Sequence, residues 1–441
     1  CFLLCDFRGG ASYSGVHALR LAPNGAGYVL AGSERLVWNV LATDVDFAPD
    51  GSVCVLDWVS GWNKTGKGRI YRLRHGGLQS SAQNHGAPTN DAAAWLARDL
   101  VKESVDTLRT LLAHPDRRVR QEAQFALVDQ AAKDPVVVAM LDTLAADRDQ
   151  PRARRHAIQA LGILGRRDVA AGKSLPKLLD DGDAEVRALT CRVLGDVHVD
   201  KGKARLIERL KDGHPRVVRE AALAIARYGD EKPAAAADLL EVARQNDDHD
   251  AVLRHAVVFA LATPGARDAL VAGLGDASVA VRRACLLALA RLGDGEIGKL
   301  LADPDAGLRR DAAHVIYEFP VPAAMQALAR LCYDDVSDGE AIDWRAINAC
   351  RMLGQTEHGE ALVHTATRRD QPIATRLEAL AVLGEWMAPH GQCRVTGNWR
   401  PAVHENPHVV AQNYLSALPD LLADGPVAGA AARAAAQLGL K

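Results

Sequence analysis

Aromatic side chains and long apolar runs are both scarce in this sequence. Phe, Trp and Tyr together make up 5% of its 441 residues. No apolar run reaches the roughly 18 residues that a membrane-spanning helix needs. The formal net charge is −2, so the chain as a whole has no strong attraction for nucleic acid or for an anionic membrane. We therefore expect no transmembrane segment and no globally basic nucleic-acid binder.

Motifs for catalysis and metal binding are missing as well. None of the eight cysteines forms a CxxC pair, and there is no CxxCH haem-attachment motif. The chain has no GxSxG, no P-loop and no GxGxxG before a helix. His404-Glu405 is a single His-Glu pair, whereas a carboxylate–histidine di-iron site needs several. We predict no catalytic residue, no metal ligand and no cofactor site within the chain.

One helical pattern recurs along most of the chain. Pro215–Gly229 (PRVVREAALAIARYG) and Val279–Gly293 (VAVRRACLLALARLG) both place an arginine before small and aliphatic residues at helical spacing. The arginines that mark the pattern are Arg120, Arg155, Arg187, Arg219, Arg254, Arg283, Arg310, Arg345 and Arg376, separated by 27 to 35 residues on subtraction. A helical repeat with a period near 32 residues is typical of an α-solenoid.

Aspartates precede three of these arginines by four residues: Asp116, Asp183 and Asp250. An aspartate in that place, followed by a basic first turn, predicts a helix N-cap. We expect the solenoid to cover residues 91–441, with an inserted loop at 388–407 that is rich in proline and glycine and precedes a last helix pair, Asn413–Leu440.

Residues 1–75 have a different, strand-like composition. Six short runs, Cys1–Phe7, His17–Leu21, Gly27–Trp38, Thr43–Phe47, Ser52–Trp58 and Arg69–Arg74, are separated by glycine-rich turns. This spacing predicts about one and a half four-stranded blades of a β-propeller, and 76–90 is expected to be a linker. The predicted fold is thus mostly α: an α-solenoid preceded by a partial propeller.

The strand region holds one group of residues typical of a ligand site. Asp44, Asp46, Asp57, Trp58 and Arg69 lie close together in the sequence, and an Asp/Arg pair could orient a polyol or a quinone carboxylate near a propeller channel. The alternative is structural: the aspartates cap turns, and Arg69 pairs with one of them.

Arginines are densest on two adjacent repeats, at Arg117, Arg118, Arg120, Arg152, Arg154 and Arg155. Such a face could grip a phosphate backbone. Nearby Asp116, Glu122, Asp147 and Asp149, with no interleaved aromatic residues, favour a salt-bridged surface instead. Nucleic-acid binding is the less favoured hypothesis.

The repeats resemble the HEAT family in its short bacterial form over roughly residues 100–440. The resemblance is carried by Asp-x-x-Val-Arg starts, such as Asp183–Arg187, and by second helices ending in Leu-Gly. It implies an α-solenoid whose surface binds proteins, as most such solenoids present surfaces rather than chemistry.

A second resemblance covers the N-terminal region. Cys5–Leu19, Trp38–Gly51 and Asp57–Leu73, with Arg394–Pro401 (RVTGNWRP) near the end, are similar to membrane-bound dehydrogenases of planctomycetes and verrucomicrobia. These are related to quinoprotein sugar dehydrogenases and join a propeller to HEAT repeats and then to a cytochrome c domain. The resemblance implies pyrroloquinoline quinone (PQQ) and haem c outside these residues, and a periplasmic or envelope-associated location.

Because most of a propeller is missing and the chain starts at Cys1, we expect it to be a segment of a longer protein. Three hypotheses follow: a non-catalytic docking scaffold within a dehydrogenase-like protein, a free-standing scaffold that binds a protein, and a nucleic-acid-binding solenoid.

Overall fold

The computed structural model describes residues 2–59, 66–74, 91–228, 235–334 and 339–440. It divides into two compact units. The first contains Cys1–Gly229 and Asp250–Ala256, and the second contains Asp230–His249 and Val257–Lys441. The predicted linker at 76–90 lies outside the described residues.

All six predicted strands form. They are β1 (Phe2–Asp6), β2 (Gly15–Asn24), β3 (Gly27–Trp38), β4 (Ala42–Phe47), β5 (Val53–Asp57) and β6 (Arg69–Leu73). They make two antiparallel sheets of three strands, ordered β1-β2-β3 and β4-β5-β6. The predicted arrangement, one four-stranded blade and half of another, is wrong for these strands.

The chain leaves the first sheet between β3 and β4, which explains the difference. Asn39 adopts a left-handed φ of 63°, and the next two residues, Val40 and Leu41, are buried. This step carries β4 away from β3, so β4 starts a new sheet. The two sheets share a small apolar core of Val16, Val40, Ala42 and Val55.

The first unit contains the earlier helices. They are α1 (Ala92–Leu96), α2 (Val105–Leu111), α3 (Arg117–Ala131), α4 (Pro135–Ala146), α5 (Pro151–Arg167), α6 (Ala184–Val197), α7 (Asp200–Glu208), α8 (Pro215–Arg227) and the start of α10 (Ala251–Leu261). The predicted caps are confirmed: Asp116 accepts from the Arg118 amide, Asp183 from the Glu185 amide and Asp250 from the Val252 amide.

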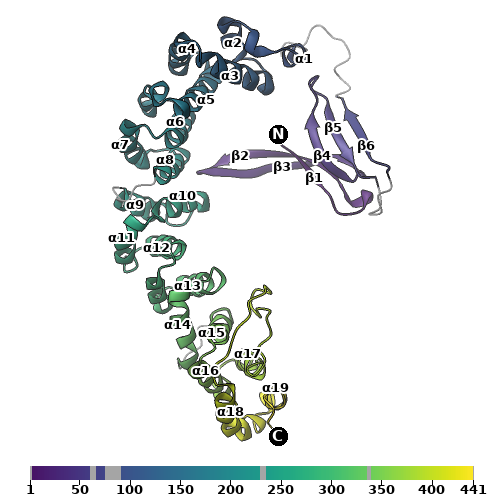
Figure 1. The fold of residues 1–441 in the computed structure, drawn as a ribbon, viewed down its shortest axis with the longest axis vertical. Helices are drawn as coiled ribbons and strands as arrows, with labels where there is room; N and C mark the ends of the chain where they lie inside the picture. Colours follow the sequence, from purple (N-terminus) through teal and green to yellow (C-terminus); the bar gives the residue numbers. More distant parts are fainter. Residues whose placement is uncertain (1, 60–65, 75–90, 229–234, 335–338, 441) are drawn as a thin grey trace. The chain divides into compact units, whose positions relative to one another are not determined.

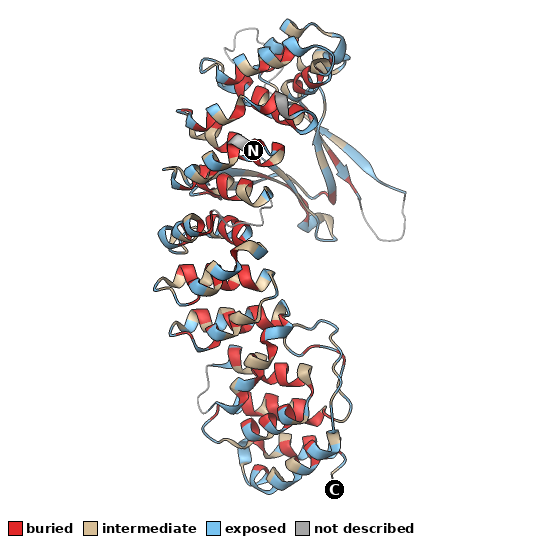
Figure 2. Cartoon of the chain, turned by 60° about the vertical axis from the view of Figure 1, so that its left-hand side comes forward, coloured by how far each residue is buried: buried red, intermediate tan, exposed pale blue. Residues whose placement is uncertain are grey.

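The second unit continues the helical pattern. Its helices are α9 (Ala236–Asn246), the end of α10, α11 (Arg267–Gly273), α12 (Val279–Arg291), α13 (Ala306–Glu318), α14 (Pro322–Arg330), α15 (Glu340–Leu353), α16 (Thr356–Thr367), α17 (Ile373–Gly384), α18 (Pro407–Leu422) and α19 (Gly425–Gln437). Within each unit the buried residues face neighbouring helices (Figure 2). The last pair begins at Pro407 rather than at the predicted Asn413 because Pro407 occupies the first helical position, which proline favours.

The segment between α17 and α18 packs onto the second unit through its side chains. The His404 ring stacks on buried Trp386 with centroids 3.9 Å apart. The fully buried Arg351 guanidinium donates to the His390 carbonyl, and Arg400 donates to the Tyr317 carbonyl at 2.9 Å. The predicted inserted loop is therefore held by specific contacts.

Candidate functional site

The turn between β2 and β3 lies against two helices of the first unit. Figure 1 shows this long hairpin ending at α8. Ala26, at its tip, is fully buried. The Ala26 amide donates to Asp250 Oδ2 at 2.6 Å, and its carbonyl accepts from Arg219 Nη1 at 3.3 Å. Both main-chain groups of one residue are therefore bound by side chains from the helices.

Asp250 uses its two carboxylate oxygens for different purposes. Oδ1 accepts from the amides of Val252 and Leu253 at 2.9 and 3.0 Å, which caps α10. Oδ2 accepts from Ala26. A carboxylate is favoured at this end of a helix because the free amides give it partial positive charge. The same residue thus begins a helix and anchors the hairpin.

The glycines of the turn allow this close approach. Gly25 has a left-handed φ of 54°, and a Cβ placed there would lie 2.2 Å from Asp250 Oδ2. A Cβ on Gly27 would lie 2.9 Å from Val252 Cγ2. Next along the chain, Tyr28 lies under the Arg216 guanidinium, 4.9 Å from its ring centroid, a cation–π arrangement.

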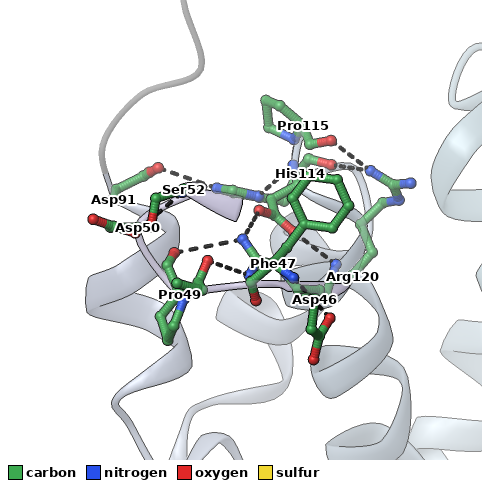
Figure 3. Close-up of polar contacts among 12 residues, drawn as sticks. Asp46, Phe47, Pro49, Asp50, Ser52, Asp91, His114, Pro115 and Arg120 are labelled. Carbon is green, nitrogen blue, oxygen red and sulfur yellow. Dashed lines mark hydrogen bonds and ion pairs between the residues drawn. The ribbon is translucent and has the colours of Figure 1, made fainter. Parts of the chain in front are cut away.

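A second turn of the sheets is bound in a similar way at α3. The Arg118 guanidinium donates to the carbonyls of Phe47 and Ala48, at 3.2 and 2.7 Å, and to that of Pro49 at 3.4 Å. Arg118 is itself held by Asp116, the cap of α3, at 2.7 Å. Figure 3 shows this turn beside His114, whose ring lies 3.2 Å from an Asp91 oxygen. Two turns of the sheets therefore contact helix N-termini through main-chain atoms.

The predicted ligand residues fall into two groups. Asp44 and Asp46 are exposed, and each accepts from the amide of the following residue. Asp57, Trp58 and Arg69 line a hollow of about 670 Å³. Asp57 is buried and accepts from the amides of Leu41 and Val59. Arg69 donates to the Tyr71 hydroxyl at 3.3 Å. The structure brings three of the five residues together, and the Asp57 carboxylate among them already accepts hydrogen bonds from main-chain amides.

The marker arginines occupy more than one position of the repeat. Arg120 and Arg187 each directly follow a fully buried valine of the second helix, Val119 and Val186. In three other repeats the equivalent residue is the one before the marker: Arg154, Arg282 and Arg309. Arg155 pairs with Asp183, Arg283 with Asp311, and Arg345 with Glu318, while Arg219 binds the hairpin and Arg310 is exposed.

The equivalent arginines join neighbouring repeats. Three of them donate to an aspartate in the next turn between helices, in the pairs Arg154–Asp181, Arg187–Asp212 and Arg282–Asp303. Arg120, Arg187, Arg282 and Arg309 also donate to carbonyls five and six residues earlier. The ion pairs of Arg154, Arg187 and Arg282 to the next repeat are mostly buried.

The dense arginine cluster is largely engaged with the protein's own acceptors. Arg118 binds the Phe47–Pro49 turn, Arg120 binds His114 and Pro115 carbonyls, Arg154 is buried against Asp181, and Arg155 pairs with Asp183. These contacts favour the salt-bridged interpretation, because guanidinium groups already paired are less available to phosphates.

Metal sites and membrane-spanning helices have little support in the part of the chain that the structure describes. That part contains no group of three or more His, Cys, Asp or Glu residues arranged to hold a metal ion. His404 contacts the carbonyls of Trp386 and Arg351, each at 3.0 Å. Among the described residues no single helix is long and apolar enough to cross a membrane; Ala251–Leu261 and Pro264–Gly273, bent by 95°, qualify only as a pair.

Sequence reasoning missed the contact between the hairpin turn and the helices that bind it. Asn24-Gly25 is a turn signal, and Asp250 is a predicted cap, but nothing local links the two. Ala26 and Asp250 are 224 positions apart. The unusual feature was the second glycine, Gly27, which a hairpin turn alone does not require.

Comparison with known proteins identifies the repeats. A family model described as HEAT repeats matches residues 173–262. No curated protein matches the chain. The chain thus contains HEAT repeats, and its fold is a mostly helical HEAT solenoid with two small N-terminal three-stranded sheets.

Solved helical-repeat structures are similar at low identity. An engineered protein is 20% identical with a TM-score of 0.33, over 76% of this chain and 99% of its own. Yeast importin-β Kap95p is 11% identical with a TM-score of 0.43, over 79% of this chain and 55% of its own. Karyopherin Kap121p, in a structure bound to the SUMO protease Ulp1p, is 13% identical with a TM-score of 0.49, over 81% and 44%. The chain spans about half the length of these two karyopherins.

Proposed function

We propose that this chain is a docking scaffold: its HEAT repeats hold the N-terminal β-sheets in place and offer the remaining repeat surface to a protein partner. The observation that carries the proposal is the binding of two sheet turns by α3, α8 and α10 within one unit. A repeat that binds main-chain atoms of a non-helical segment has the chemistry that peptide and domain docking requires.

The contacts favour docking over catalysis. The charged groups at both turns are used to bind amides and carbonyls, as with Asp250 and Arg118. A general acid, base or nucleophile needs a group free to exchange protons or attack a substrate. At these turns Asp250 caps and anchors, and Arg118 is paired with Asp116.

Cleavage of the predicted linker tests the proposal. A specific protease site is placed within 76–90, and the folded chain is cut and passed over a sizing column. We expect the sheet piece and the helical piece to elute together. The double variant Arg118→Ala/Asp250→Ser should separate them, whereas the control Arg117→Ala should not. If the two pieces of the cut chain separate when neither Arg118 nor Asp250 has been substituted, docking is refuted.

The wider context remains a proposal that the sequence resemblance alone supports. In it the chain is the scaffold segment of a dehydrogenase-like protein in the periplasm or cell envelope, with PQQ in further propeller blades and haem c in a following domain. Sequencing the coding DNA on both sides tests it. Additional blades upstream and a CxxCH motif downstream would support it, and a frame that closes near Cys1 and Lys441 would leave the free-standing scaffold.

A further inference from the structure

The residue two places after the cap differs between α10 and the two other helices capped by a predicted aspartate, α3 and α6. That residue is Arg118 after Asp116, Glu185 after Asp183, and Val252 after Asp250. The first two are long charged side chains: Arg118 binds the Phe47–Pro49 turn, and Glu185 pairs with Arg216. At α10 the shorter Val252 side chain lies against Gly27, where an added Cβ would come within 2.9 Å of Val252 Cγ2.

The cap residues differ in the use of their second oxygen. In Asp116 it pairs with Arg118 at 2.7 Å, and in Asp183 it pairs with Arg155 at 3.3 Å. In Asp250 it accepts a main-chain amide from the hairpin at 2.6 Å. The second oxygen of the α10 cap therefore binds a turn of the sheets.

We propose that the N-terminal ends of α8 and α10 form a binding site selective for a tight Gly-X-Gly β-turn followed by an aromatic residue, and that Asn24–Tyr28 of this chain is its ligand. The inference rests on the proposed docking function and names the ligand of that docking. Recognition is through the main chain of the central residue, with Asp250 as acceptor and Arg219 as donor.

Three features of the site restrict which turn sequence can bind. Any side chain on Gly25 meets the Asp250 carboxylate, and any on Gly27 meets Val252. The central residue is fully buried, so only a small side chain fits. The aromatic ring that follows lies under Arg216, which Glu185 holds in place at 2.9 Å.

Disulfide trapping tests whether the turn occupies this site. A Cβ on Gly27 would lie 3.6 Å from Val252 Cβ, within the range of about 3.5–4.5 Å found in disulfides. We expect the full chain carrying Gly27→Cys/Val252→Cys to form this bond under mild oxidation, as mapped by peptide mass spectrometry. The control Gly32→Cys/Val252→Cys places the thiol farther along β3 and should not cross-link. Equal yields in both, or no bond in the first, would overturn the proposal.

Hydrogen exchange tests these features. Asp250→Ser retains a cap oxygen but loses the second acceptor, and should speed exchange of the Ala26 amide by about tenfold or more. Gly25→Ala should do the same, because it combines a left-handed φ with a collision at Asp250. Asp183→Ser and Gly32→Ala are the matched controls, with helix content followed by circular dichroism. Exchange at Ala26 that stays unchanged in both Asp250→Ser and Gly25→Ala would exclude selective binding.

The two experiments separate failure of the site from failure of the scaffold. If the cut pieces elute together but the cross-link does not form, docking stands and this turn-binding site is wrong. If the pieces separate, the scaffold proposal itself fails.

Discussion

Arg282 donates from Nε and Nη2 to the two oxygens of Asp303, at 2.7 and 2.8 Å, and both side chains are at least nine-tenths buried. The remaining nitrogen, Nη1, donates to the carbonyls of Asp276 and Ala277. One guanidinium therefore joins the turn of its own repeat to the turn of the next. Interactions between neighbouring repeats are the main source of cooperativity in solenoids.

Removing this arginine should be costly. Arg282→Ala leaves the Asp303 carboxylate buried without its partner, and we expect a loss of about 3–5 kcal/mol in the free energy of unfolding, measured with urea. The surface variant Arg330→Ala should change it by less than about 0.5 kcal/mol. In the double variant Arg282→Met/Asp303→Leu much of the loss should be recovered, since no charge remains buried. A small effect of Arg282→Ala would show that water reaches the pair.

Lowering the pH should reduce the stability of the first unit because of His156, which is held neutral in the folded state. Its Nδ1 contacts Gln124 Oε1 at 2.8 Å, and its Nε2 accepts from Arg120 Nε at 3.1 Å. Burial, assisted by the charges of Arg120 and Arg117, lowers the pKa of His156 to about 4. In the unfolded chain the pKa of His156 is near 6.5, so the unfolded state binds the proton first as the pH falls. The contribution of neutral His156 to stability is therefore fully present above about pH 6.5 and is lost as the pH falls toward 4.

The measurement compares urea unfolding at pH 7 and pH 5. The wild-type chain should lose roughly 1 kcal/mol more than His156→Gln, a value reduced for the partial exposure of the ring. Glutamine can accept from Arg120 and donate to Gln124 without titrating. Identical pH dependence of the two proteins would contradict the prediction.

A glycine of the second unit should resist substitution. Gly354 has a left-handed φ of 69°, and a Cβ there would lie 2.1 Å from the Val403 carbonyl oxygen. We expect Gly354→Ala to cost about 2–3 kcal/mol in urea unfolding, from backbone strain and displacement of the Val403 segment. Gly429→Ala is the control: it lies within α19 with only Arg433 near, at 3.8 Å, and should stabilise by about 0.5–1 kcal/mol.

The segment between α17 and α18 should depend on Arg351. This buried side chain donates to the His390 carbonyl, so Arg351→Met leaves that carbonyl without its donor. We expect trypsin to cleave after Arg394 at least about tenfold faster, because local opening becomes more frequent. Native Arg394 is held by Glu378 through two hydrogen bonds of 2.8 Å. The surface variant Arg330→Met should leave the rate unchanged.

Features fixed by nearby residues could be predicted from the sequence. The caps Asp116, Asp183 and Asp250 were found because capping depends on residues two or three places away. The six strands were found because alternation and turn residues are local signals. Their division into two sheets was not, since it depends on the packing of Val40 against Val16 and Val55, which lie on strands distant in sequence.

Repeat register and docking required three-dimensional information. Doublets such as Arg154-Arg155 and Arg282-Arg283 offer two candidates for one position, and only the structure shows that the first of each forms the buried ion pair with the next repeat. The pairing of Ala26 with Asp250 leaves no periodic trace, because a main-chain amide has no sequence signal of its own.

The two bound turns have a mechanical consequence for the first unit. Both belong to sheets that share one apolar core around Val16 and Val55, so α3 and α8 are connected twice, once through the intervening repeats and once through the sheets. A solenoid in which each repeat contacts only its neighbours bends easily, because small rotations between successive repeats add up along it. With a second connection, any change in curvature between α3 and α8 must strain the β core or release a turn. The stiffness of this unit is then set by a few hydrogen bonds to Ala26 and Ala48.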